Sequence, residues 1–236
     1  MNDSLDLGLK EKVAIVAGAG AKGDGIGNGR AAAILLAEAG AKVVVADNDQ
    51  ELAEKTVQMI SERKGHAVSV AADLTKATDC EKVVKYALNH YGRLDVLDNN
   101  IGIASNLSVV EESEEYWDRV MAVNLKPMFL LSKYAIPAMI SSGDGGSIVN
   151  ISSISATRPK GLTAYSTSKG AVISLTQAMA VDHGSDGIRV NCILPGPVYT
   201  PMVYASSSYL NQEGMSSEQR SQRQNASLLQ IEGEGW

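Results

Sequence analysis

Short apolar segments alternate with longer helical patterns along most of this chain, and this alternation limits the possible folds more than any other feature. Most of the apolar segments are nearly continuous runs of Val, Ile, Leu and Ala, which is typical of parallel strands covered on both faces. Six segments are predicted strands: KVAIVAG (12–18), AKVVVAD (41–47), HAVSVAAD (66–73), LDVLDNN (94–100), GSIVNIS (146–152) and IRVNCILPG (188–196). The intervening stretches include a long predicted helix near 113–139 and another at 163–182. The alternation predicts one α/β domain built on a doubly wound parallel sheet, the Rossmann fold.

The bulk composition excludes several classes of protein. The chain has 236 residues, enough for one large α/β domain, and its net charge of −6 argues against a nucleic-acid or anionic-membrane partner. No apolar run reaches the length of a membrane span, and the N-terminus lacks the layout of a signal peptide. The only cysteines, Cys80 and Cys192, form no metal-ligand spacing. We therefore expect reduced thiols, no bound metal and a cytoplasmic location.

A glycine-rich stretch, GAGAKGDGIGNGRAA (18–32), leaves the first predicted strand and enters the first predicted helix. It fits G-x-G-x-x-G from Gly18 and G-x-x-x-G-x-G from Gly23. In this setting glycines let the backbone approach a pyrophosphate, and the helix N-terminus offers N–H donors and a partial positive charge. The stretch therefore predicts a phosphate-binding loop of a dinucleotide site.

An acidic residue, Asp47, closes the second predicted strand. Its carboxylate can accept hydrogen bonds from the adenosine ribose hydroxyls and would repel a 2′-phosphate, so NAD is favoured over NADP. Lys22 in the glycine loop is the counter-argument, because it could pair with that phosphate. Asp47 could instead cap the next helix, a role that Asn48 or Asp49 would serve equally well.

Tyr165 and Lys169 stand four residues apart in AYSTSKG, which puts both side chains on one face of a helix. A phenol with an ordinary pKa of about 10 is a poor acid or base near neutrality. A neighbouring ammonium lowers that pKa by favouring the phenolate. Taken alone, the pair fits a plain helix surface as well as a catalytic site.

Several further motifs follow one another in a fixed order, and with them the chain resembles the short-chain dehydrogenase/reductase family over nearly its whole length. After the glycine loop come AD, ADL, NNIG, VNL, GSIVNISS, YSTSK and PGPVYTPM. The resemblance implies that Tyr165 exchanges the proton of the substrate oxygen and that Lys169 holds the nicotinamide ribose and depresses the pKa of the phenol. It also implies that Ser153 hydrogen-bonds the substrate oxygen and that Asn124 anchors a water in a proton relay.

The resemblance also implies the residues around the cofactor. Those near the adenine are Asp73 and Leu74, those along the middle are Asn100, Ile101 and Gly102, and those at the nicotinamide end are Pro195, Gly196, Val198 and Thr200. In the glycine loop we expect contacts from Gly18, Gly25, Ile26 and Gly27, with residues 21–24 bulging outward. The register stays open, since either Gly25–Gly27 or Gly27–Gly29 can end the motif. In both registers the loop is longer than the family pattern.

Two assignments keep an alternative. Ser152 competes with Ser153, because adjacent strand residues face opposite sides and only one can reach the site. Matching along the strand favours Ser153, whereas the spacing to Tyr165 favours Ser152. Asn124 could simply tie a helix kink to a neighbouring strand.

The sequence thus predicts an oxidoreductase that moves a hydride between NAD(H) and a secondary alcohol or ketone, working as a homodimer or homotetramer. The alternatives are an NADP-dependent carbonyl or acyl-carrier-protein ketoreductase and a catalytically silent dinucleotide-binding protein. We expect a dinucleotide-binding and catalytic part at 1–198. Residues 199–236 would hold a substrate-lid segment and a truncated C-terminal part of the same domain. In the lid, at 199–215, Tyr199, Met202, Tyr204 and Tyr209 favour a hydrophobic or cyclic alcohol. The family pattern continues with another helix and a last strand beyond EGEGW, so we expect the sheet to lack that strand and the parent protein to be longer.

Overall fold

Six parallel strands form the central sheet in the computed structural model, which describes residues 7–159, 161–204, 216–225 and 232–235. The strand order is β3-β2-β1-β4-β5-β6. The strands are β1 (Val13–Ala17), β2 (Lys42–Asp47), β3 (His66–Ala71), β4 (Val96–Asn99), β5 (Gly146–Ile151) and β6 (Ile188–Ile193). This arrangement confirms the predicted doubly wound parallel sheet in a single domain.

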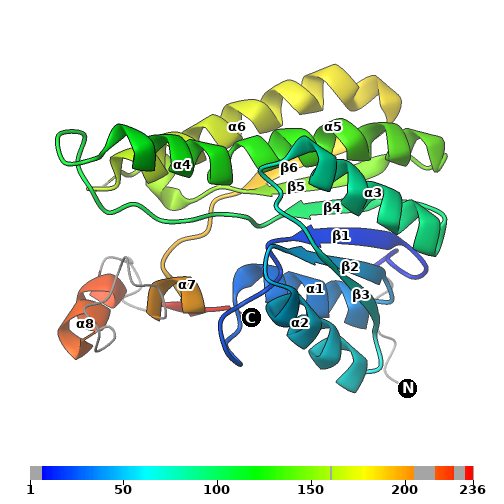
Figure 1. The fold of residues 1–236 in the computed structure, drawn as a ribbon, viewed down its shortest axis with the longest axis horizontal. Coiled ribbons are helices and arrows are strands. Elements are labelled where there is room, and N and C mark those ends of the chain that lie inside the picture. The colour runs from blue at the N-terminus through cyan, green and yellow to red at the C-terminus, as the bar shows by residue number, and fades with distance from the viewer. Residues whose placement is uncertain (1–6, 160, 205–215, 226–231, 236) are drawn as a thin grey trace.

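Helices cover both faces of the sheet (Figure 1). The helices are α1 (Asn28–Glu38), α2 (Gln50–Glu62), α3 (Ala77–Tyr91), α4 (Glu114–Asn124), α5 (Lys126–Ser141) and α6 (Thr163–His183). Helices α1 and α2 pack on one face, where Val16 and Val45 meet Ile34 and Ile60. Helices α3 to α6 cover the other face, and all five residues of β1 are buried between the two layers. Burial on both faces explains why the strands are continuous apolar runs rather than alternating ones.

The long helix predicted near 113–139 is wrong, because the chain forms two helices that meet at Leu125. Pro127 lies in the first turn of α5 and has no N–H for the carbonyl four residues earlier, which a continuous helix would need. The side chain of Asn124 then holds the end of α4 by bonding both the N–H and the carbonyl of Ile103. The break places Asn124 at the edge of the sheet where the strands end.

The last described residues form small elements beside the carboxyl edge of the sheet. These are β7 (Val198–Tyr199), α7 (Pro201–Tyr204), α8 (Ser217–Asn225) and β8 (Gly233–Glu234), of which β7 and β8 pair in parallel. Arg223 of α8 donates to the buried carboxylate of Glu232 at 2.6 Å. Of the predicted lid, residues 205–215, including Tyr209, lie outside the described residues. The six-stranded sheet contains no strand beyond β6 among the residues that the structure describes.

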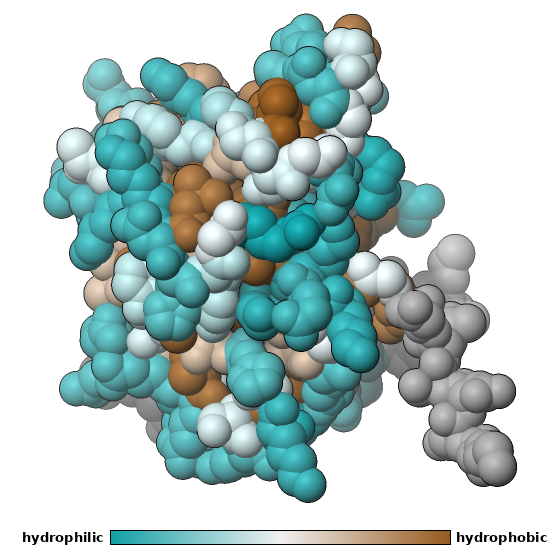
Figure 2. Space-filling view, turned by 90° about the vertical axis from the view of Figure 1, so that its right-hand side faces the viewer, coloured by the Kyte–Doolittle hydropathy of each residue, from teal (hydrophilic) through white to brown (hydrophobic). Residues whose placement is uncertain are grey.

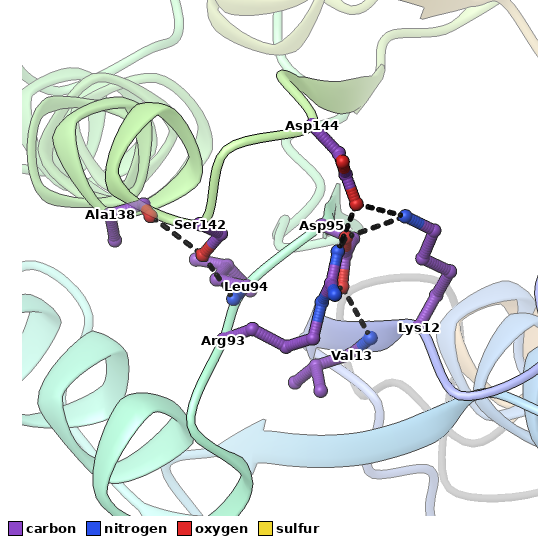
Figure 3. A network of polar contacts seen from close by, with 8 residues as sticks. All are labelled: Lys12, Val13, Arg93, Leu94, Asp95, Ala138, Ser142 and Asp144. Atoms are coloured by element: carbon purple, nitrogen blue, oxygen red, sulfur yellow. Dashed lines mark hydrogen bonds and ion pairs between the residues drawn. The ribbon is translucent and has the colours of Figure 1, made fainter.

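The opposite edge, where the strands begin, carries a network of charges centred on Asp95 (Figure 3). The Asp95 carboxylate accepts from the Val13 N–H at 2.9 Å and from two nitrogens of Arg93 at 2.9 and 2.6 Å, and it pairs with Lys12 at 3.2 Å. Asp144 bridges the same two cations. Burial alone would raise the pKa of Asp95, but these partners outweigh it and lower the pKa. The face seen from this side of the molecule is largely hydrophilic (Figure 2), whereas the predicted site residues gather at the other end of the strands.

Candidate active site

The predicted site residues converge on the carboxyl edge of the sheet, around the point where the strand order reverses between β1 and β4. Open α/β sheets bind ligands in the crevice outside this point, because the two adjacent connections run to opposite faces. The glycine loop follows β1, Asn100 to Gly102 follow β4, and Ser153 follows β5. Tyr165 and Lys169 come from the first turns of α6. Segments more than 100 residues apart in the sequence are therefore brought to one edge.

The glycine loop packs as tightly as a phosphate loop requires. Gly18 has φ +77°, and a Cβ there would lie 3.0 Å from the backbone of Asn100 and Ile101. A Cβ on Gly29 would lie only 2.2 Å from the carbonyl oxygen of Gly18, so α1 approaches the end of β1 at glycine distance. Helix α1 begins at Asn28, directly after Gly27.

The N-terminus of α1 is chemically suited to an anion. No side chain caps it, and its first turn holds no acidic residue, so its leading N–H groups stay available. Within the loop, Ile26 is partly buried against the core, and Gly25 packs against Pro201 and the Tyr204 hydroxyl of α7. Lys22, Gly23 and Asp24 are exposed while Ala21 is buried, so the outward bulge spans three residues rather than the four expected.

Asp47 ends β2 and turns its carboxylate toward the glycine loop. One oxygen accepts the Gly20 N–H at 2.8 Å, and the other accepts the Asp49 N–H at 3.2 Å. Asp49, and not Asp47, caps α2 by accepting the Leu52 N–H. A Cβ on Gly20 would lie 2.7 Å from the Asp47 carboxylate, so a larger residue would displace that side chain. Asp47 thus joins the loop to the end of β2.

The residues after β3 and β4 surround the same edge. Asp73 accepts hydrogen bonds from Thr75 and forms an ion pair with Lys76. These contacts lower the pKa of its carboxyl. The next residue, Leu74, is buried. Asn100 donates its side-chain amide to both carboxylate oxygens of Asp98 at 2.9 Å.

Asp98 is a buried carboxyl in β4 that the sequence analysis did not single out. It is 6% exposed, and burial raises its pKa to about 7, an effect that the hydrogen bond from Asn100 only partly opposes. Its neighbours in the sheet register are Val16 and Val149, which offer no hydrogen bond from their side chains. Asp98 therefore orients Asn100 beside the site while its ionised form is disfavoured by the surroundings.

We expect the Asp98→Asn variant to be more stable than the wild type at pH 8, with the difference shrinking toward pH 5. The pKa of Asp98 in the folded protein lies above its ordinary value. The contribution of Asp98 to the stability is therefore fully present below about pH 4 and is lost as the pH rises to about 7. The full effect is at most roughly 4 kcal/mol, and we expect a gain on the order of 1–3 kcal/mol. Urea unfolding of both proteins at pH 5 and pH 8 measures it. Equal stabilities at pH 8 would mean that the carboxylate is solvated in the folded protein.

Two neighbouring serines at the end of β5 face different partners. The Ser152 hydroxyl donates to the Lys169 carbonyl at 2.7 Å and so faces the backbone of α6. The Ser153 hydroxyl accepts the Ser155 N–H at 3.1 Å and lies within hydrogen-bond reach of the Tyr165 phenol. Burial raises the pKa of Tyr165, and the contact with Ser153 opposes this rise. Of the two serine hydroxyls, that of Ser153 therefore lies beside the Tyr165 phenol.

Lys169 is buried beneath Tyr165, with its ammonium 5.9 Å from the centre of the phenol ring. It donates to the Ile151 carbonyl at 2.8 Å and to the Ile101 carbonyl at 3.4 Å. Burial lowers its pKa to about 8, and nearby Cys192 opposes this effect. In this structure burial, rather than Lys169, dominates the pKa of Tyr165. A Cβ on Gly102 would lie 3.3 Å from the ammonium, so the glycine keeps the space before it open.

Asn124 stands at the back of the group and is fully buried. Besides its two bonds to Ile103, it donates to the Ser168 hydroxyl at 3.0 Å, so it ties α4, the segment after β4 and α6 together. Its side-chain oxygen lies 3.5 Å from the Cβ position of Gly102. These contacts fit the alternative in which Asn124 ties a helix kink to a neighbouring segment, and they hold the residues around Lys169 in place.

The segment after β6 closes the other side of the site. The Pro195 carbonyl accepts the Ile154 N–H at 3.0 Å, which joins the segment to the turn that follows Ser153. Gly196 is exposed, Val198 lies in β7, and buried Thr200 accepts the N–H groups of α7. Above it the rings of Tyr199 and Tyr204 pack at 4.9 Å between centroids.

Comparisons with known proteins agree with this geometry. The family model described as short chain dehydrogenase matches residues 12–210. An oxidoreductase of uncharacterised activity from Thermotoga maritima is 42% identical over 80% of this chain and 73% of its own length. Cyclohexanol dehydrogenase from an Acinetobacter strain is 37% identical over 83% of this chain and 76% of its own length.

The solved structures give the same answer at the level of the fold. A crystal structure assigned to a short-chain dehydrogenase/reductase of Burkholderia xenovorans superposes with a TM-score of 0.87 at 33% identity, covering 96% of this chain and 85% of that one. The chain therefore belongs to the short-chain dehydrogenase/reductase family, whose members are NAD(P)-dependent oxidoreductases. In the described part of the chain, no helix has the length and apolar composition that a membrane crossing needs.

Sequence reasoning missed one further residue at the site, Arg30 of α1. It is the largest of the fully buried side chains and binds the glycine loop. A signal was present, because Arg30 occupies the same helical stripe as the buried residues Ala33, Ile34 and Ala37. A charged residue in an otherwise apolar stripe indicates a buried polar role.

Proposed function

We propose that this chain is an NAD-dependent oxidoreductase that interconverts a secondary alcohol and a ketone, with Tyr165 as the general acid and base. The observation that carries the proposal is the convergence of the Ser153 and Tyr165 hydroxyls over buried Lys169, next to an uncapped helix N-terminus. These residues would supply proton-transferring groups and a phosphate-binding element on one edge of the sheet. The bound nicotinamide dinucleotide would supply the hydride acceptor or donor.

The residues after the strand ends fit a dinucleotide laid along this edge. Gly18, Gly25, Ile26, Gly27 and the N-terminus of α1 would hold the pyrophosphate, Asp47 the adenosine ribose, and Asp73 and Leu74 the adenine. Asn100, Ile101 and Gly102 would lie along its middle, and the segment with Pro195, Gly196, Val198 and Thr200 at its nicotinamide end. The open space at Gly102 before the Lys169 ammonium supports a ribose at that point.

The protein's own part in the reaction is proton transfer and charge stabilisation. In alcohol oxidation, the Tyr165 oxygen takes the hydroxyl proton of the substrate, and in ketone reduction it returns a proton to the carbonyl oxygen. The Ser153 hydroxyl hydrogen-bonds the same substrate oxygen and stabilises the charge that develops on it. Lys169 places a positive charge below the phenol, and Asn124 fixes the segments that carry Lys169 and Gly102.

Apolar and aromatic side chains beside the site support one class of substrate. The rings of Tyr199 and Tyr204 pack against each other at a tilt of 37°, and Met202, which lies between them in the sequence, is 42% exposed. These side chains support a hydrophobic or cyclic secondary alcohol, and the name of the Acinetobacter relative, cyclohexanol dehydrogenase, points in the same direction.

A panel of secondary alcohols with NAD, followed by absorbance of NADH at 340 nm, tests this proposal. We expect turnover of small cyclic and branched alcohols, and the same panel with NADP should give much lower rates. Preference for NADP would favour a carbonyl or acyl-carrier-protein ketoreductase. NADH binding without turnover of any alcohol or ketone would favour a silent dinucleotide-binding protein.

We also propose that the chain associates with copies of itself through α5 and α6. Phe129 and Ile140 on α5 are 49% and 43% exposed, and Val181 on α6 is 83% exposed. Large apolar side chains exposed on these two helices support an interaction site there. Sedimentation equilibrium should give a dimer or tetramer, whereas a monomer at micromolar concentration would refute this.

A further inference from the structure

Arg30 carries a positive charge in the first turn of α1, where the helix dipole disfavours it. Its side chain is 0% exposed, although long charged side chains are seldom fully buried without a partner of opposite charge. Among the described residues, no ion pair includes Arg30, and the nearby acid Asp24 pairs instead with Lys55 at 3.1 Å. A charge kept in such a place needs an explanation from its contacts.

The guanidinium donates only to neutral oxygens. Its Nε bonds the Thr56 hydroxyl at 3.0 Å, and one Nη bonds the Gly23 and Gly25 carbonyls at 2.9 and 2.7 Å. The other Nη bonds the Ala21 carbonyl at 2.8 Å and the Leu52 carbonyl at 3.4 Å. All five N–H groups of an arginine are thereby engaged. No donor is left over for a ligand.

These contacts follow a regular pattern along the glycine loop. The Thr56 hydroxyl, which accepts from Arg30, itself donates to the Ala19 carbonyl at 2.8 Å. The carbonyls of residues 19, 21, 23 and 25 are therefore all drawn toward Arg30 or its partner Thr56. Every second carbonyl of the lengthened part of the loop points inward.

We propose that Arg30 is a positioning residue for the dinucleotide: it folds the lengthened glycine loop without touching the ligand. The proposal rests on the proposed dinucleotide-binding function. By holding the carbonyl oxygens inward, Arg30 keeps their negative ends away from the phosphates and fixes the backbone at the entry to α1. Its charge, offset by carbonyl dipoles but by no carboxylate in contact, adds to the positive potential at that helix end.

The test compares the Arg30→Lys and Thr56→Val variants of the full chain with the wild type. Lysine keeps the charge but lacks the planar fork that joins Ala21, Gly23 and Gly25, and valine keeps the shape of Thr56 without its hydroxyl. In the cofactor-free proteins, we expect faster amide hydrogen exchange at residues 19–27. We expect Arg30→Lys to raise the Kd for NADH at least about 10-fold and to change kcat at saturating NAD less than about 3-fold, with a smaller change in Kd for Thr56→Val.

Asp95→Asn is the control, because it weakens a buried network at the opposite edge of the sheet and should lower stability without changing the Kd. Wild-type exchange and Kd in Arg30→Lys would overturn the proposal. The proposal would also be overturned if Asp95→Asn accelerated amide exchange in the loop as much as Arg30→Lys does, since that would show general destabilisation. If the wild-type chain itself does not bind NADH, the proposed function fails together with the effect on affinity. Loop exchange then decides on its own whether Arg30 folds the loop.

Discussion

Replacing Tyr165 by Phe should abolish turnover while dinucleotide binding survives. The substitution removes one oxygen and keeps the buried ring over Lys169, so the packing of α6 is retained. Loss of a positioned general acid or base costs roughly 10²–10⁴-fold in rate. We therefore expect kcat to fall by about that factor in both directions of the reaction, and the Kd for NADH to change less than about 3-fold.

The matched control is Tyr86→Phe, which removes the same atom from α3. Tyr86 stacks on His90 at 5.8 Å between ring centroids and lies on α3 (Ala77–Tyr91), a helix that carries none of the residues assigned to the site. Its kcat should equal that of the wild type. Retained turnover in Tyr165→Phe, or equal losses in both variants, would show that the phenol does not carry the proton.

The direction of the pKa shift adds a second expectation for the same residue. Burial raises the pKa of Tyr165, so the phenol holds its proton near neutrality in the cofactor-free protein. Ketone reduction needs the protonated form, whereas alcohol oxidation needs the phenolate. Oxidation by the wild type should therefore increase with pH above neutrality. In the Tyr165→Phe variant, kcat/KM for alcohol oxidation should no longer rise with pH.

The fold was predictable because the apolar pattern of each strand indicates whether one or both of its faces are buried. Continuous apolar runs such as VAIVA in β1 require cover on both faces, and the helical stretches between them supply that cover. The break at Leu125 was not predictable in the same way. Pro127 coincides with it, yet Pro137 lies inside α5 without ending that helix. The difference comes from tertiary contacts, because Asn124 reaches across to the segment after β4.

The sequence motifs could group the candidate site residues, but they could not define the contacts between them. Spacing alone could not choose between Ser152 and Ser153, since the choice depends on which face of β5 lies toward Tyr165. The role of Arg30 depends on carbonyls of residues 21, 23 and 25, and a backbone carbonyl leaves no trace in a sequence pattern. Asp98 lies inside the predicted strand 94–100 and belongs to no motif, and its burial depends on the layers that pack over β4.

The Asp47→Asn variant should lose most of the preference for NAD over NADP. The amide oxygen can still accept the Gly20 N–H that Asp47 accepts at 2.8 Å, so the loop keeps its connection to β2. The substitution removes the negative charge of Asp47, which would repel a 2′-phosphate. Two unit charges 4 Å apart near a protein surface interact by roughly 4 kcal/mol. We expect the ratio of kcat/KM for NAD to that for NADP to fall about 100-fold, equivalent to about 2.8 kcal/mol.

Asp49→Asn provides a control with the same change of charge two residues away. Asp49 caps α2, and asparagine caps a helix equally well, so the fold and stability should be unchanged. Equal changes of cofactor preference in both variants would mean that net charge, not the position of Asp47, sets the selectivity. An Asp47→Ala variant separates the remaining role, because it removes the Gly20 contact as well. If Asp47 also orders the loop, alanine should weaken binding of both dinucleotides, whereas asparagine should weaken only NAD.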